Sequence, residues 1–171
     1  MDIKKIKILL VEDNPDDAFL LHAALEKVTG THFEIDSARD LAAGVARLDQ
    51  GDIDVILLDL NLPDSAGMDT IKTVKTHSRD VPIIVLGGVD DETIAINAVH
   101  AGAEDYLVKG KINSQLITRA IIYAMERTDA KKAVIKAEEK FRSIFENSVS
   151  GIFQTTPEGS YLNVNPALAR I

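Results

Sequence analysis

Five short apolar segments alternate with five segments of helical periodicity, and this alternation limits the fold more than any other feature. The apolar segments are residues 6–11, 33–36, 54–58, 82–86 and 104–108. Between and after them, apolar residues recur at the i, i+3, i+4, i+7 spacing of a helix with one buried face. Strands that alternate with helices form a parallel sheet covered on both sides. We therefore predict an α/β fold with a five-stranded, parallel, doubly wound sheet.

End signals place several of the expected helices. The first begins at Pro15, a residue tolerated in the first turn, with Asn14 available as the cap. The fourth ends at Gly102, and the fifth begins near Lys111. The aspartate pairs 16–17 and 90–91 are expected at the N-termini of the first and fourth helices, where negative charge is favourable.

Residues 125–148 differ from the rest of the chain. They contain no glycine and no proline and are strongly helix-forming. A heptad pattern runs through Ala120, Arg127, Val134 and Phe141 at one seam position and Tyr123, Ala130, Ala137 and Ile144 at the other. Arg127 interrupts the apolar seam, so two interpretations stay open, a coiled coil and a solvated extension of the fifth helix.

The final residues, 151–171, contain two strand-like runs on either side of the turn signal Pro157-Glu158-Gly159. This pattern predicts a hairpin. Because a lone hairpin is only marginally stable in water, we expect the chain to stop inside a second domain.

Composition excludes several classes of protein. There are no cysteines, so disulfides, thiolate metal sites and a cysteine nucleophile are excluded. No apolar run approaches the ~20 residues of a membrane span, and the N-terminus lacks the features of a signal peptide. The net charge of −8 argues against broad binding to nucleic acid or to an anionic membrane. We predict a cytoplasmic protein.

Acidic residues follow two of the predicted strands at the point where each ends. Glu12 and Asp13 follow the first strand, and Asp59 follows the apolar run of the third. Lys109 follows the fifth strand. In an open parallel sheet the ligand site lies at the carboxyl ends of the strands. These four side chains are therefore expected to meet at one edge.

Three crowded carboxylates repel one another unless a cation is present. Oxygen ligands without histidine or cysteine favour a hard ion such as Mg²⁺. A carboxylate at such a site can itself act as the nucleophile and form an aspartyl phosphate. Asp59 is the strongest candidate, although a single aspartate at a strand end is more often a helix cap or a solvated loop residue.

Three motifs resemble the receiver domain of bacterial two-component response regulators. They are "VEDN" at 11–14, "DLNLPDSAG" at 59–67 and "AEDYLVKG" at 103–110, and the likeness covers roughly residues 4–127. The resemblance implies a flavodoxin-like sheet in the order 2-1-3-4-5. It also implies a phosphoacceptor signalling domain rather than an enzyme.

The resemblance further implies roles for individual residues. Asp59 would accept a phosphoryl group from a histidine kinase or a phosphotransfer protein, and Lys109 would contact that group. Glu12, Asp13 and Asp59 would hold Mg²⁺ together with the backbone carbonyl of Asn61. Tyr106 matches an aromatic switch that turns inward on activation. A homodimer is expected through helix four, strand five and helix five, or through the helix that follows.

Gly87 departs from the family pattern, in which strand four usually ends in Thr or Ser. A glycine offers no hydroxyl, so we expect phosphorylation with weak coupling to Tyr106, or coupling through the helix-four loop alone. Glycine as a tolerated variant is the simpler alternative. Two further alternatives are a pseudo-receiver that serves as a dimerising interaction domain, and an aspartate-nucleophile phosphatase, which Asn61 disfavours.

Residues 137–171 resemble the opening of a PAS sensory domain, over roughly its first third. The sequence therefore predicts a receiver domain at 1–127, a linker or signalling helix at 128–147 and the truncated start of a PAS-like domain at 148–171.

Overall fold

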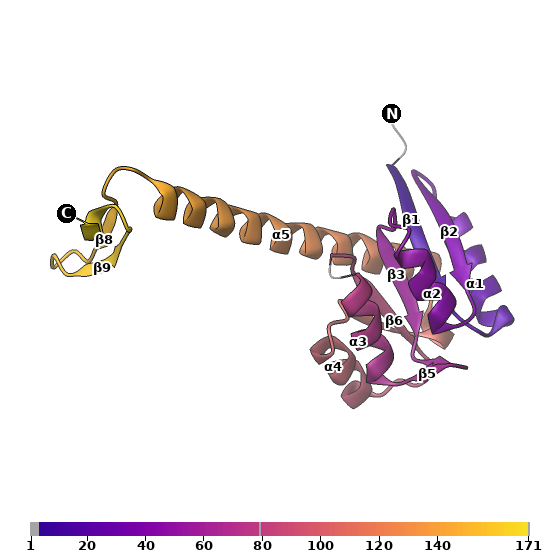
Figure 1. Cartoon of the computed structure of the whole chain (residues 1–171). Helices are drawn as coiled ribbons and strands as arrows, with labels where there is room; N and C mark the ends of the chain where they lie inside the picture. The colour runs from indigo at the N-terminus through magenta and orange to yellow at the C-terminus, as the bar shows by residue number, and fades with distance from the viewer. Residues whose placement is uncertain (1–3, 79, 171) are drawn as a thin grey trace. The chain divides into compact units, whose positions relative to one another are not determined.

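The computed structural model describes residues 4–78 and 80–170. The chain divides into two compact units, Met1–Thr128 and Asp129–Ile171 (Figure 1).

The first unit contains a five-stranded parallel sheet in the order β2-β1-β3-β6-β7. Its strands are β1 (Lys4–Val11), β2 (Thr31–Ala38), β3 (Val55–Asp59), β6 (Ile83–Gly87) and β7 (Asp105–Val108). Counted along this sheet alone, the order is 2-1-3-4-5, which confirms the predicted fold class. All residues of the central strands β3 and β6 are buried, because helices cover both faces.

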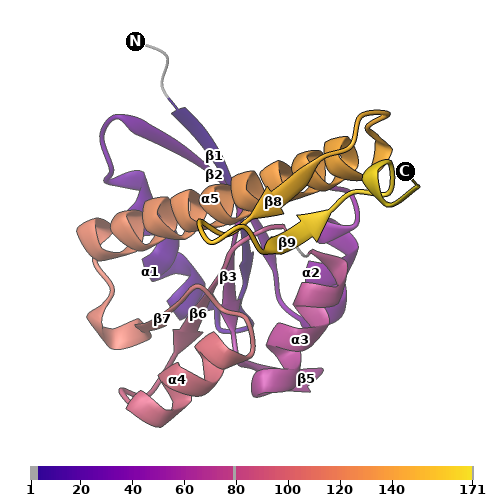
Figure 2. The same ribbon diagram turned by 90° about the vertical axis from the view of Figure 1, so that its left-hand side faces the viewer.

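Helices form a layer on each face of the sheet (Figure 2). The helices of this fold are α1 (Pro15–Glu26), α2 (Leu41–Leu48), α3 (Met68–His77), α4 (Glu92–His100) and α5 (Ser114–Asn147). Alternate residues of β3 point into different layers. Leu57 packs in the cluster that contains residues of α1 and α5, whereas Leu58 packs in the cluster with residues of α2, α3 and α4. Each such buried side chain contributes about 1.5–3 kcal/mol relative to exposure.

The predicted helix starts are confirmed for α1 and α4. The side chain of Asn14 accepts hydrogen bonds from the backbone N–H groups of Asp16 and Asp17, and Pro15 is the first helical residue. Asp91 caps α4 by accepting from the N–H groups of Thr93 and Ile94.

The fifth helix begins later than predicted. Residues Lys109–Lys111 form a 3₁₀ turn, η1, and α5 starts at Ser114 rather than near Lys111. The side chain of Asn113 accepts from the N–H of Leu116 at 2.8 Å, which fixes this later start. A small two-stranded sheet, β4 (Asn61–Leu62) with β5 (Ser65–Ala66), was not predicted because two-residue strands leave no periodic pattern.

The second unit contains the later part of α5, the antiparallel hairpin β8 (Phe153–Thr155) with β9 (Tyr161–Val164), and the 3₁₀ turn η2 (Leu168–Arg170). The predicted hairpin is confirmed. The side chain of Asn165 is fully buried and accepts from the N–H of Ile152 at 2.8 Å, while its amide donates to the carbonyl of Ser150 at 2.9 Å.

Within the described chain, no helix combines the length and the apolar character that a membrane crossing requires.

Candidate acidic site at the carboxyl edge of the sheet

Three carboxylates meet at the carboxyl edge of the sheet, as the sequence predicted. Glu12 directly follows β1, Asp13 comes next, and Asp59 is the last residue of β3. One oxygen from each lies within 4.8 Å of the others. Glu12 and Asp59 are only 3% and 4% exposed, whereas Asp13 is exposed. The cluster therefore combines two buried acids with one that faces solvent.

Lys109 supplies the positive charge of this cluster. It follows β7 directly, and its ammonium nitrogen lies 2.7 Å from Asp59 Oδ2 and 2.7 Å from Glu12 Oε2. The same nitrogen donates to Asp17 Oδ2 at 2.9 Å. One cation thus contacts three carboxylates: one directly after β1, one at the end of β3 and one in the first turn of α1.

Burial and charge act together on the pKa values of this site. Burial raises the pKa of the Glu12 carboxyl above its usual value, and the negative charge of Asp59 acts in the same direction, against a hydrogen bond from Lys109. Burial alone would lower the pKa of Lys109, but hydrogen bonds to Asp59, Glu12 and Asp17 outweigh it and raise that pKa. Lys109 is therefore a permanent cation at this edge.

The segment after β3 holds Asp59 in place. The N–H of Asn61 donates to Asp59 Oδ1 at 3.0 Å, so both carboxylate oxygens have a hydrogen-bond donor. Asp64 anchors the same segment by accepting from the N–H groups of Leu41 and Ala42 at the start of α2, at 2.8 and 2.9 Å. The carboxylate that ends the buried strand is therefore rigidly oriented.

The donor set fits a hard divalent cation. Glu12 Oε1 accepts from the N–H of Asn14, and the Lys109 ammonium lies 2.7 Å from Glu12 Oε2. Oxygens of Glu12, Asp13 and Asp59 lie within 4.8 Å of one another, and an oxygen-only group of this kind is what a hard divalent cation binds.

The predicted switch residues Gly87 and Tyr106 lie against each other. The hydroxyl of Tyr106 donates to the carbonyl of Val89 at 2.7 Å. A Cβ built on Gly87 would overlap the hydroxyl oxygen and Cζ of Tyr106 and would lie 2.6 Å from its Cε2. The Tyr106 side chain thus occupies the space that any side chain at position 87 would need.

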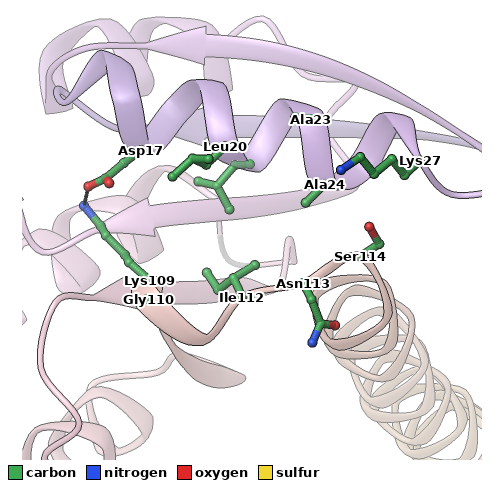
Figure 3. A pocket seen from close by; sticks show the side chains of 11 residues that line it. Asp17, Leu20, Ala23, Ala24, Lys27, Lys109, Gly110, Ile112, Asn113 and Ser114 are labelled. Carbon is green, nitrogen blue, oxygen red and sulfur yellow. Dashed lines mark hydrogen bonds and ion pairs between the residues drawn. The ribbon is translucent and has the colours of Figure 1, made fainter.

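A cavity of about 370 Å³ adjoins Lys109 (Figure 3). It lies between α1 and the segment that leads from β7 into α5, with Leu20 and Ile112 on opposite walls and Asp17 beside Lys109 at one end. Leu20 and its neighbour Phe19 are 64% and 71% exposed. An apolar rim therefore lies next to the acidic cluster.

Asp17 is the site residue whose contact the sequence did not predict. Its expected role was to place charge at the start of α1, which it does. Its side chain also reaches Lys109, and only the packing of α1 beside β7 reveals this. The sequence placed Asp17 in the first turn of the helix, three residues after Asn14, and this position near the end of the first strand was the only indication that it could reach the site.

The chain matches the family described as response regulator receiver domain over residues 8–121. It is 32% identical to the transcriptional regulatory protein KdpE of Staphylococcus aureus, over 85% of this chain and 58% of that protein. It is 25% identical to the sensor histidine kinase TmoS of Ectopseudomonas mendocina, over 96% of this chain but only 20% of that protein. The chain thus spans between a fifth and three fifths of these two relatives.

Solved structures show the same fold. The receiver domain of sensor histidine kinase PA1611 from Pseudomonas aeruginosa PAO1, described with a magnesium ion coordinated in its active site cleft, is 27% identical. It superposes with a TM-score of 0.62 over 71% of this chain and 98% of that one. The phosphorylated cyanobacterial phytochrome response regulator RcpA is 31% identical, with a TM-score of 0.57 over 68% of this chain and 89% of that one. The family match covers most of the chain and includes the acidic edge, so the chain belongs to the response regulator receiver domain family.

Proposed function

We propose that this chain is a phosphoacceptor module of a two-component signalling protein, in which Asp59 takes a phosphoryl group from a histidine kinase or a phosphotransfer protein. The observation that carries the proposal is the buried Asp59 carboxylate at the end of β3, hydrogen-bonded by the Lys109 ammonium beside two further acids. An aspartate with a purely structural role does not need an ammonium group and two further carboxylates beside it. A nucleophile that receives an anionic phosphoryl group does need a nearby positive charge.

The reaction is a transfer between two proteins. An oxygen of Asp59 attacks phosphorus and forms the new P–O bond, while the P–N bond of the donor phosphohistidine breaks and its electron pair stays on the imidazole. Lys109 holds an oxygen of the incoming phosphoryl group, because its ammonium already lies within hydrogen-bond distance of the acceptor carboxylate. The Asn61 N–H keeps the carboxylate oriented.

Mg²⁺ is the cofactor that the donor set favours. Glu12, Asp13 and Asp59 would hold it, together with the backbone carbonyl of Asn61. When bound, it neutralises the negative charge that gathers between the carboxylates and the phosphoryl group. The magnesium ion named for the PA1611 receiver domain supports this assignment.

The donor protein must bring its histidine to Asp59, so it has to contact the surface around the acidic edge. We assign that contact to Phe19 and Leu20, which are exposed apolar residues on α1. Leu20 lines the cavity beside Lys109. Ile96 and Val99 of α4 form a second exposed apolar surface. We assign this surface to the contact through which the module passes its signal on.

We assign residues 1–127 to the receiver, 128–147 to a signalling helix and 148–171 to the start of a PAS-like domain. The boundary between the compact units supports the first division. Val134, Phe141 and Ile144 form an exposed apolar stripe at heptad spacing, which supports a homodimer through this helix. We also propose a cytoplasmic module, and the net charge of −8 supports one that binds neither nucleic acid nor an anionic membrane.

The proposal is tested by intact-mass measurement after incubation with Mg²⁺ and a small acyl phosphate. The native chain should gain one phosphoryl group, and Asp59→Asn should gain none. The conservative variant keeps the shape of the side chain, and a single cooperative thermal unfolding transition serves as its folding control. Equal labelling of the two chains, or labelling of neither, would contradict the proposal.

A further inference from the structure

Gly87 lies at the same sheet edge as Asp59 and Lys109. In the register of β3 with β6, Asp59 is the partner of Leu86, so Gly87 is one residue beyond that partner. In the register of β6 with β7, Gly87 is the partner of Val108, the residue before Lys109. Asp59, Gly87 and Lys109 therefore stand at the ends of three neighbouring strands, at the edge where a phosphoryl group on Asp59 would lie.

Tyr106 places a hydroxyl over Gly87. Its oxygen and the adjoining Cζ fill the place where a side chain at position 87 would begin. The ring reaches this position because Gly87 has no Cβ; any other residue at 87 would exclude it. The hydroxyl group missing from the end of β6 is thus replaced in space by one from the neighbouring strand β7.

The hydroxyl of Tyr106 is a hydrogen-bond donor with a replaceable partner. It donates to the carbonyl of Val89, in the segment between β6 and α4. Burial raises the pKa of the Tyr106 phenol, and the charges of Asp91, Asp90 and Asp59 add to this effect. The phenol therefore keeps its proton at neutral pH. Rotation about the bond between Cζ and the oxygen redirects that proton without moving the ring.

We propose that the Tyr106 hydroxyl donates a hydrogen bond to an oxygen of the phosphoryl group on Asp59 and so replaces the side-chain hydroxyl that Gly87 lacks. This inference rests on the proposed function of Asp59. The phosphoryl oxygen and the Val89 carbonyl compete for one proton, so phosphorylation releases the segment before α4 from its bond to Tyr106. The ring itself stays where it is, and the signal passes through that segment.

The first test compares the native chain with Tyr106→Phe, which keeps the ring and removes the hydroxyl. A hydrogen bond to a charged group corresponds to a change of roughly 10- to 100-fold, so Tyr106→Phe should bind beryllium fluoride, a phosphoryl analogue, that much more weakly in the presence of Mg²⁺. Labelling by acyl phosphate should slow by a similar factor. The affinity for Mg²⁺ alone should stay the same. Equal binding of beryllium fluoride by both chains would overturn the inference.

A second pair of variants separates hydrogen bonding from a structural effect, because Tyr106→Phe also loses the bond to Val89. Tyr106→Ala empties the space over Gly87, and Tyr106→Ala with Gly87→Thr puts a hydroxyl back from β6. Both of these variants lack the hydrogen bond to Val89. The double variant should nevertheless recover most of the beryllium fluoride affinity that Tyr106→Ala loses. No recovery would show that Tyr106 acts only through its packing and would overturn the inference.

An error in the role of Tyr106 and an error in the role of Asp59 would give different experimental results. If the native chain is labelled on Asp59 and Tyr106→Phe behaves identically, only the role of Tyr106 is wrong. If the native chain neither is labelled nor binds beryllium fluoride, the proposed function is wrong and the role of Tyr106 is rejected with it.

Discussion

The ammonium group of Lys109 lies 2.7 Å from Oδ2 of Asp59, although the two residues are 50 positions apart in the chain. The same ammonium contacts Glu12 and Asp17, so the three acids depend on one cation. Because removal of one partner from a buried charge cluster leaves the others uncompensated, Lys109 should contribute to folding as well as to phosphoryl transfer.

Lys109→Gln should lower the melting temperature in metal-free buffer at neutral pH, and Mg²⁺ should restore part of the loss. The pKa of Lys109 is raised in the folded chain, so the folded chain holds this proton more tightly than the unfolded one. The stabilisation is therefore complete below the ordinary lysine pKa of about 10.4 and is lost as the pH rises through the higher folded value. Chemical denaturation from neutral to alkaline pH measures the difference between the two chains.

Lys27→Gln is the matched control, because Lys27 is exposed and lines the same cavity without a contact to the acidic cluster. It should unfold like the native chain. A difference between native and Lys109→Gln that stays constant to high pH would contradict the assigned charge pairing.

Asp13→Asn should raise the melting temperature of the metal-free chain by about 2–4 °C. The carboxylate of Asp13 lies close to those of Glu12 and Asp59, and their repulsion opposes folding when no cation is bound. The same variant should show a smaller rise in melting temperature with Mg²⁺, because it has lost a metal ligand.

Asp16→Asn, an equal charge change at a neighbouring exposed position, should respond to Mg²⁺ like the native chain. Equal Mg²⁺ responses of Asp13→Asn and the native chain would remove Asp13 from the metal site.

Replacing Phe19 and Leu20 by alanine should slow phosphoryl transfer from a histidine kinase by roughly 10-fold, which corresponds to about 1.4 kcal/mol of lost apolar contact. Labelling by a small acyl phosphate should be unchanged, because the variant leaves the acidic edge intact. Ile96→Ala with Val99→Ala removes comparable exposed apolar surface from α4 and is the control. The assignment of the donor surface fails if the α4 variant loses transfer and the α1 variant does not.

Gly87→Ala should destabilise the native chain by about 1–3 kcal/mol, the usual cost of overpacking. The added Cβ would overlap the Tyr106 hydroxyl and ring. In a Tyr106→Ala background the same change should cost much less. Denaturant unfolding of the four chains gives the coupling between the two positions. Additive effects within ~0.5 kcal/mol would mean that Tyr106 does not occupy the space over Gly87 in solution.

Hydrophobic periodicity was sufficient to predict the sheet and its helices. The strands β1, β3, β6 and β7 are fully or largely apolar, β2 alternates apolar and polar residues around Phe33 and Ile35, and the helices have one buried face. The strand ends then placed Glu12, Asp13, Asp59 and Lys109 at one edge, where the structure brings them together. The strand order came from the resemblance to receiver domains. Periodicity alone does not determine which strands are neighbours.

The contacts of Asp17 and Tyr106 could not be predicted in the same way. Asp17 meets Lys109 because α1 packs beside the end of β7, a relation between segments 92 positions apart. The sequence pointed to Gly87 as a missing hydroxyl, but not to the space that its missing Cβ leaves for Tyr106. Arg127, which interrupts the apolar heptad pattern, has a contact that the pattern could not predict. Its guanidinium donates a hydrogen bond to the backbone carbonyl of Glu104 at 2.7 Å.

Borohydride reduction identifies directly the carboxylate that carries the phosphoryl group. The native chain is incubated with acyl phosphate and Mg²⁺ and then reduced with borohydride, which converts a phosphorylated aspartate to homoserine, and the peptides are sequenced by mass spectrometry. We expect homoserine at position 59 and unmodified aspartate at positions 13 and 17. Modification at position 13 or 17, or a reduced chain with aspartate intact at position 59, would contradict the assignment of Asp59 as the phosphoacceptor.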